Sequence, residues 1–369
     1  INDGLMTIFF LLVGLEIKRE LLVGELSSFR KAALPFIAAC GGMLFPVIVY
    51  MSICPPGSAG SQGLAIPMAT DIAFSLGVLS LLGSRVPLSL KIFLTAFAVV
   101  DDIGGILVIA LFYSSHVSYG YILIAALLYV LLYFIGKRGT TNKIFFLVIG
   151  VVIWYLFLQS GIHSTISGVI LAFVIPAKPR LDVGKYIEHI RHTIAGFPVV
   201  ESGSIVLTNE QIAKLKEVES ASDRVISPLQ SLEDNLHGAV NYLILPLFAF
   251  VNAGVVFSGG GELVGSVGMA VAAGLLFGKF AGIYFFTWLA IKIKLTPMPP
   301  GMTWKNLSGI ALLGGIGFTV SLFIANLSFG ANYPVLLNQA KFGVLSGTIL
   351  SGLLGYIVLR IVLPVRKRK

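Results

Sequence analysis

The chain has 369 residues, of which 56% are hydrophobic and only 12% carry a charge. A globular domain in water has about 25% charged residues, so this composition excludes an ordinary soluble protein and indicates a polytopic membrane protein. The net charge of +9 does not by itself indicate a nucleic-acid partner, because in membrane proteins the position of the basic residues decides their meaning. Two cysteines, Cys40 and Cys54, are too few for a disulfide framework.

We predict an all-α fold from eleven apolar segments, each interpreted as a membrane span. Residues 1–176 form the first part of the membrane domain with about seven spans, residues 177–237 a cytoplasmic insertion loop, and residues 238–369 the second part with four spans. Because the sequence opens at Ile1 rather than at a Met, we expect another segment before it. The predicted spans are 4–16, 32–53, 65–82, 88–113, 118–136, 144–159, 161–176, 238–257, 263–291, 307–328 and 335–361.

The connections between the spans alternate in charge. The connection after the first span contains four basic residues between positions 18 and 31, whereas the next one, residues 54–63, contains neither Lys nor Arg. The alternation continues to the basic tail at the C-terminus. Cytoplasmic loops of membrane proteins carry the excess of Lys and Arg, so we predict that the C-terminus is cytoplasmic and that Ile1 lies on the opposite side.

The insertion contains one segment with a helical pattern, residues 208–225. Thr208 followed three residues later by Gln211 is typical of a capping box at a helix N-terminus. We predict a short amphipathic cytoplasmic helix and interpret the insertion as a solvated linker in preference to a regulatory element. His189 and His192 are three residues apart, but no other ligand spacing supports a metal site there.

Four ionisable residues fall well inside the predicted spans: Asp71, Asp101, Asp102 and Lys279. A charge at mid-bilayer costs roughly 2.5–3.5 kcal/mol even on the mildest scale, so such residues usually mark ion or proton pathways. Neighbouring residues on a helix are about 100° apart, so one of the two adjacent carboxylates is expected to face the lysine and the other the ion path. The alternative is a buried ion-pair network without a transport role; for Lys279 by itself, a separate alternative is a side chain that extends to the membrane interface.

Glycines surround Lys279 at four-residue spacing, at positions 274, 278 and 282. Small residues at this spacing let another helix approach closely, so we expect a neighbouring helix to bring a partner near the amine.

Two spans contain helix breakers. Span 65–82 has Pro67 before Thr70 and Asp71, and span 307–328 has three glycines between positions 314 and 317. Unsatisfied backbone groups at membrane depth are tolerated only inside protein or along a cavity, and paired broken helices are typical of secondary transporters. The hydroxyl of Thr70 and the carboxylate of Asp102 are hard oxygen ligands suited to Na⁺ or Li⁺.

Five long motifs follow one another along the chain: FFLLVGLEIKREL, ATDIAFSLGVLSLLGSRVP, AVVDDIGGI, YLILPLFAFVNAGV and GGIGFTVSLFIANLSFG. Together they resemble the bacterial NhaA-type Na⁺/H⁺ antiporter family, over the whole chain except residues 177–230. The resemblance implies an inverted-repeat transporter fold with two unwound, crossing helices, eleven of twelve spans being present here. It also implies an electrogenic antiporter, not an enzyme, that exports Na⁺ or Li⁺ in exchange for protons by alternating access, for pH and sodium homeostasis.

The resemblance implies a location in the bacterial cytoplasmic (inner) membrane. We expect a homodimer surrounded by membrane lipid, with no nucleic-acid partner and no cofactor beyond the transported Na⁺, Li⁺ and H⁺.

The resemblance also assigns site residues. Asp101 and Asp102 match the paired ion- and proton-handling carboxylates, with Asp102 the favoured Na⁺ ligand beside Thr70. Lys279 is the partner of Asp101, and Asp71 compensates helix-end charge at the unwound segments. The pH-response region implied by the resemblance comprises Glu16, Arg19, Glu20, Glu233 and His237.

Two further positions qualify this assignment. Asp234 stands where the better-known family pattern has a second histidine, which puts the pH range of activation in question. His163 resembles another family histidine, although we favour a packing role for it.

Two other function classes were weighed. Intramembrane aspartyl proteases also need two membrane carboxylates, but they carry them in YD and GxGD contexts that neither Asp71 nor the Asp101–Asp102 pair matches. A Na⁺-coupled solute symporter of similar fold needs polar substrate-binding groups in its cavity. Few uncharged candidates appear beyond Thr70, Thr319 and Ser321.

Overall fold

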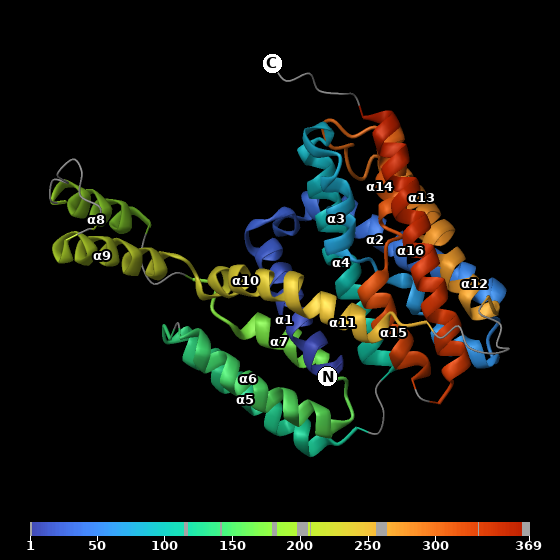
Figure 1. Cartoon of the computed structure of the whole chain (residues 1–369), viewed down its shortest axis with the longest axis horizontal. Coiled ribbons are helices and arrows are strands. Elements are labelled where there is room, and N and C mark those ends of the chain that lie inside the picture. The colour runs from blue at the N-terminus through green and yellow to red at the C-terminus, as the bar shows by residue number, and fades with distance from the viewer. Residues whose placement is uncertain are drawn as a thin grey trace.

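The computed structural model describes residues 2–113, 117–140, 142–178, 183–197, 206, 208–255, 264–330 and 332–363, and these contain helices and connections but no strand. The all-α prediction is therefore confirmed for this part of the chain (Figure 1). The helices are α1 (Asn2–Val23), α2 (Phe29–Ile53), α3 (Ile72–Ser80), α4 (Leu88–Phe112), α5 (Tyr119–Lys137), α6 (Lys143–Ser160), α7 (Thr165–Val174), α8 (Val183–Ala195), α9 (Asn209–Val225), α10 (Pro228–Ala239), α11 (Leu245–Asn252), α12 (Ser266–Ala273), α13 (Lys279–Lys292), α14 (Trp304–Leu313), α15 (Phe318–Phe329) and α16 (Pro334–Val362).

Within the described ranges, six helical stretches are long and apolar enough to cross a membrane on their own. Their outward faces carry large exposed apolar side chains, for example Leu123 and Leu127 on α5 and Ile144 and Val151 on α6. In water such surfaces would be costly, whereas lipid tails accept them. The six stretches are α2, α4, α5, α6, α16 and the combined stretch Ser266–Lys292, which contains α12 and α13.

Two further spans are each divided by a bend. The short turns η2 (Ala59–Gly63) and η3 (Ile66–Met68) are bent by 46° relative to α3, and α14 is bent by 44° relative to α15. The first break contains Thr70 and Asp71, and the second contains three glycines. Gly315 has to be a glycine because a Cβ there would lie 2.3 Å from the carbonyl oxygen of Leu275. The predicted helix breakers therefore do interrupt their spans.

Helix α1 extends beyond the predicted span 4–16, to Val23, and packs along α7 (Figure 1). Small residues allow the close approach: a Cβ on Gly168 would lie 2.5 Å from the carbonyl oxygen of Thr7. Lys18 on α1 donates to the carbonyl oxygens of Phe173 and Ile175 at the C-terminal end of α7. A cation at this end complements the negative end of the helix dipole, so Lys18 fixes α7 against α1.

The insertion forms a helical pair that stands away from the membrane helices, as Figure 1 shows for α8 and α9. Helix α9 (Asn209–Val225) confirms the helix predicted for residues 208–225, and its capping box is present. The backbone N–H of Gln211 donates to Thr208 Oγ1 at 3.3 Å, and that of Thr208 donates to Gln211 Oε1 at 2.9 Å. Helix α8 was not predicted. The side chain of His189 lies outside the described residues, as does the basic tail 364–369.

Helix α10 begins at Pro228, inside the range assigned to the insertion, and runs through the π-helical turn η5 (Val240–Ile244) into α11. Ser227 caps it by accepting from the N–H of Gln230 at 3.2 Å. Helix α10 packs against α1, so the last part of the insertion range contacts the membrane helices.

A second π-helical turn, η6 (Gly274–Gly278), lies directly before Lys279, whose N–H donates to the carbonyl oxygen of Gly274 five residues back. Turns of this kind inside α-helices frequently occur at functional sites. The predicted glycine face contacts α2: a Cβ on Gly278 would lie 2.6 Å from Pro46 Cα, and one on Gly282 would lie 2.1 Å from the carbonyl oxygen of Gly41. The glycines thus allow the close helix approach expected from their spacing.

Candidate functional site

The two adjacent carboxylates lie in the middle of α4 and are both buried, Asp101 with 1% and Asp102 with 4% of its surface exposed. The apolar run around them makes α4 a continuous helix, so the two side chains leave it in different directions. Asp101 Oδ2 lies 2.6 Å from Lys279 Nζ. No described residue donates a hydrogen bond to the carboxylate of Asp102 or forms an ion pair with it. The pair is therefore divided into one neutralised and one unpaired carboxylate.

Lys279 is fully buried and has three kinds of neighbour. Besides Asp101, its ammonium donates to Thr70 Oγ1 at 2.9 Å and lies 5.7 Å from the centre of the Phe97 ring. Thr70 in turn donates to the carbonyl oxygen of Gly314 at 2.8 Å. Gly314 is the residue after the last turn of α14. The lysine charge is thus connected through one hydroxyl to the negative, C-terminal end of a broken helix.

Asp71 occupies the complementary position, between two helix N-termini. It caps α3 by accepting from the N–H of Phe74 at 3.1 Å. Its other oxygen accepts from the N–H of Thr319, in the first turn of α15, at 3.1 Å and from the Thr319 hydroxyl at 2.5 Å. A carboxylate near a helix N-terminus is stabilised by the helix dipole. Asp71 therefore compensates the positive ends of both broken helices at once.

The two breaks are joined to one another by hydrogen bonds. The N–H of Asp71 donates to the carbonyl oxygen of Ile316 at 2.6 Å. The hydroxyl of Ser321 donates to the carbonyl oxygen of Ile66 at 2.8 Å. Ser75 Oγ donates to the carbonyl oxygen of Leu313 at 3.0 Å. Backbone groups released by the breaks are therefore satisfied inside the protein, as membrane depth requires.

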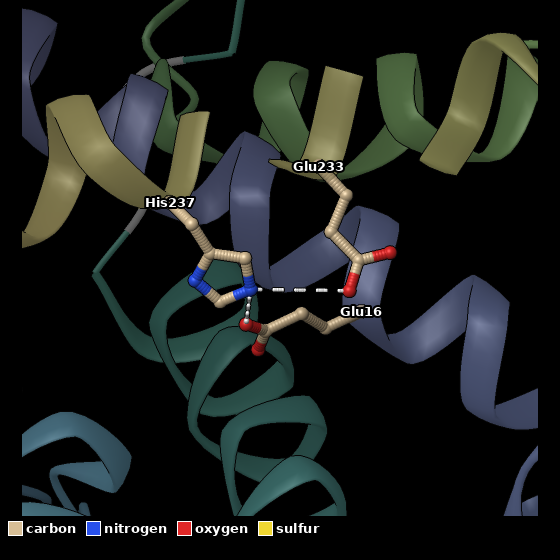
Figure 2. Close-up of side chains that lie close together, drawn as sticks. All are labelled: Glu16, Glu233 and His237. Atoms are coloured by element: carbon tan, nitrogen blue, oxygen red, sulfur yellow. Dashed lines mark ion pairs between the residues drawn. The ribbon is translucent and has the colours of Figure 1, made fainter. Parts of the chain in front are cut away.

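The residues of the predicted pH-response region also come together, where α1 and α10 meet (Figure 2). Arg19 donates to Glu233 Oε1 and to Glu20 Oε1, each at 2.8 Å. His237 Nε2 lies 3.3 Å from Glu16 Oε1 and 3.9 Å from Glu233 Oε1. We call these five residues the α1–α10 cluster.

Comparison with known proteins places the chain in a family. The family model described as Na⁺/H⁺ antiporter 1 matches residues 1–359. The chain belongs to the Na⁺/H⁺ antiporter 1 family.

Curated relatives agree with this family membership. The Na(+)/H(+) antiporter NhaA of Bacteroides fragilis is 82% identical over 367 residues, which cover 100% of this chain and 84% of that protein. The antiporter NhaA of Phocaeicola vulgatus is 64% identical, with 99% of this chain and 82% of that protein covered. That of Rhodospirillum rubrum is 46% identical, with 98% and 82% covered. These relatives are transporters by name, and none is an enzyme.

A cluster of three asparagine side chains was not predicted from the sequence. Asn2 and Asn252 exchange side-chain hydrogen bonds at 2.9 and 3.0 Å, and Asn326 Nδ2 donates to Asn252 Oδ1 at 3.1 Å. The three amides connect α1, α11 and α15. We counted only ionisable residues inside spans; a count that included amides would have found Asn252 and Asn326.

His163 lies in the turn between α6 and α7. Lys341 on α16 makes one long hydrogen bond, 3.5 Å, to the carbonyl oxygen of Gly254. Neither side chain contacts Asp101, Asp102 or Lys279.

Proposed function

We propose that this chain is an electrogenic antiporter that exports Na⁺, or Li⁺, in exchange for protons, and so serves pH and sodium homeostasis. The observation that carries the proposal is the unequal state of two adjacent buried carboxylates. Asp101 is neutralised by Lys279, whereas Asp102 has no partner among the described residues. An unpaired buried carboxylate is costly unless a cation or a proton neutralises it. Family membership supports the choice of Na⁺ and H⁺.

In the proposed cycle, Na⁺ and protons compete for Asp102. A proton neutralises the carboxylate on one side of the membrane, and Na⁺ replaces it on the other. Thr70 supplies a second hard oxygen when its hydroxyl turns from Lys279 towards the ion. Because one site serves both ions, exchange needs no simultaneous binding of the two, and each ion can cross only by displacing the other.

The broken helices make alternating access possible in this scheme. We propose the inverted-repeat fold of twelve spans, eleven of them in this chain, with the two broken helices crossing beside Asp71 and Thr70. The reciprocal hydrogen bonds between the breaks support this arrangement. The charges of Asp71 and Lys279 compensate the helix ends that meet there, as in transporters whose half-helices face an ion.

Exchange of more than one proton for each Na⁺ makes the proposed transport electrogenic. The membrane potential then contributes about 2.3 kcal/mol per charge for each 100 mV. We place the protein in the cytoplasmic (inner) membrane with its C-terminus inside, because every second connection carries the basic residues. A homodimer in lipid completes the proposal.

We further propose that the α1–α10 cluster regulates exchange according to pH. His237 contacts two carboxylates there, Glu16 and Glu233. Its contacts join α1 to α10, so a change in protonation alters how firmly the two helices are held.

The test uses the full chain in sealed vesicles, with internal pH followed after Na⁺ is added outside. We expect wild-type vesicles to show a Na⁺-driven pH change and Asp102→Asn to lose it by at least about 100-fold, since the amide keeps the shape but cannot neutralise a cation. Asp234→Asn, which makes the same change on the exposed face of α10, is the matched control and should retain transport. A normal pH change in Asp102→Asn would overturn the site assignment.

A further inference from the structure

Three metal-ligating side chains converge in the α1–α10 cluster from two helices (Figure 2). Glu233 and His237 are four residues apart and so lie on one face of α10, and Glu16 faces them from α1. One ligand atom from each lies within 4.8 Å of the other two. We infer that Glu16, Glu233 and His237 form a binding site for a divalent metal ion of the zinc class, through which such an ion inhibits transport.

The distances suit this class of ion. Zinc binds His nitrogen and carboxylate oxygen at about 2.0–2.2 Å in tetrahedral geometry, which separates adjacent ligand atoms by about 3.3 Å. His237 Nε2 already lies 3.3 Å from Glu16 Oε1 and 3.9 Å from Glu233 Oε1. The side chain of His237 is 43% exposed, so the imidazole is free to adjust, and the carboxylates of Glu16 and Glu233, whose ligand atoms lie within 4.8 Å of one another, draw together on the ion. The fourth position is left to water.

The carboxylate of Glu233 provides a second, independent observation. Its side chain is only 6% exposed, and its Oε2 is buried without a hydrogen-bond partner. Arg19 contacts Glu233 through Oε1 only. A buried carboxylate oxygen without a donor is costly. Oε2 points away from His237 in Figure 2, so a metal ion beside His237 satisfies it once the carboxylate turns about its last bond. Arg19 can stay bound because a carboxylate accepts at more than one position.

The charges of the cluster also match a divalent cation. Glu16, Glu20 and Glu233 contribute three negative charges when ionised, and Arg19 contributes one positive charge. The remaining two negative charges equal the charge of one divalent ion. One imidazole with two carboxylates is a borderline donor set that favours Zn²⁺, Cu²⁺ or Ni²⁺. Ca²⁺ is excluded because it needs six to eight oxygen ligands.

Inhibition follows from the position of the site, and this step rests on the proposed exchange function. Helix α1, which carries Glu16, packs against α4, which carries Asp102, and Ile17 and Val99 share one apolar cluster at this contact. A divalent ion bound at Glu16 therefore adds positive charge near the proposed Na⁺ ligand and lowers the local concentration of Na⁺. The ion also joins α1 to α10 through coordination bonds, so the two helices can then move only together.

Metal binding is measured first, on the full chain in detergent without a histidine tag, by calorimetric titration with Zn²⁺. We expect one saturable site in the wild type and at least about tenfold weaker binding in Glu16→Gln and in His237→Gln. The matched control is His192→Gln on α8, which should bind Zn²⁺ like the wild type. Wild-type binding in His237→Gln would overturn the inference.

A measurement on the unmodified chain guards against variants that fail to fold. Cu²⁺ replaces Zn²⁺, and its electron paramagnetic resonance spectrum should show coupling to one nitrogen, because the site contains one imidazole. Coupling to two or more nitrogens, or no bound signal, would contradict the proposed ligand set.

Inhibition is measured in vesicles, with each variant compared with its own metal-free rate. Zn²⁺ should slow Na⁺-driven proton movement in the wild type and in His192→Gln, but not in Glu16→Gln. If Zn²⁺ binds without slowing exchange, the inhibitory role is wrong while the binding site stands. If no exchange occurs even without Zn²⁺, the proposed function fails, and the titration still decides the metal site.

Discussion

Two groups of charged residues in this protein are built from distant segments in different ways. Around Lys279, two of the buried charges are connected to backbone groups: Thr70 links the lysine to the Gly314 carbonyl, and Asp71 accepts from two N–H groups at helix starts. In the α1–α10 cluster, the contacts run almost entirely between side chains, and Arg19 and His237 are 33% and 43% exposed.

The difference indicates how each region responds to change. Charges fixed by backbone in a dry interior cannot rearrange without moving the helices, so loss of one partner leaves another charge stranded. Contacts made by partly exposed side chains such as Arg19 and His237 can be replaced by water or by a neighbouring side chain. The first arrangement suits a site whose geometry must be kept, and the second suits a site whose contacts must change.

The largest effect on stability is expected from Lys279→Ala. It leaves Asp101 buried without its cation, and breaking a buried ion pair costs about 3–5 kcal/mol. Thermal unfolding of the full chain in detergent should show a clear fall in the unfolding temperature. The double variant Asp101→Asn/Lys279→Met removes both charges and should recover most of the loss. A double variant no more stable than Lys279→Ala would contradict the stranded-charge explanation.

An intermediate effect is expected from Gly278→Ala, which tests whether the buried region depends on close backbone approach. Its new Cβ would lie 2.6 Å from Pro46 Cα, and overpacking of this kind typically costs about 1–3 kcal/mol. Gly77→Ala on α3 is the matched control, since a Cβ there meets nothing within 4 Å. The same unfolding measurement should show no loss for Gly77→Ala. Equal losses in the two variants would mean that the close approach to α2 does not matter.

The smallest effect is expected from Arg19→Gln in the α1–α10 cluster. Its guanidinium is 33% exposed, so water and His237 can partly replace it beside the mostly buried Glu233, and the loss should be about 1 kcal/mol. His237 remains 3.9 Å from Glu233 and can take over part of the contact. The unfolding temperature should therefore change less than in Gly278→Ala. A loss as large as that of Lys279→Ala would show that the two regions are not different in kind.

Much of the buried region could be predicted from the sequence because charge is rare in an apolar helix. Asp101, Asp102, Asp71 and Lys279 stood out for that reason, and the breaks were visible as Pro and Gly in otherwise apolar spans. A single angular argument, that neighbours on a helix point about 100° apart, anticipated that one carboxylate only would face the lysine.

The remaining features depend on pairings between distant residues that no local pattern encodes. Thr70 was expected beside Asp102, but its hydroxyl is bonded to Lys279 and to Gly314, which are 209 and 244 residues away in the sequence. The π-helical turn before Lys279 has no signal of its own, because five-residue hydrogen bonding depends on what packs outside the helix. Helix α8 was missed because it follows no capping pattern like that of Thr208.

The hydrogen bonds between the two breaks have a mechanical consequence. Asp71 and Thr70 bond to the loop between α14 and α15, and Ser321 on α15 bonds back to Ile66. Each broken span thus provides hydrogen-bond partners for polar groups at the break of the other span. Movement of one break alone would leave these buried polar groups without hydrogen-bond partners, so we expect the two breaks to move together.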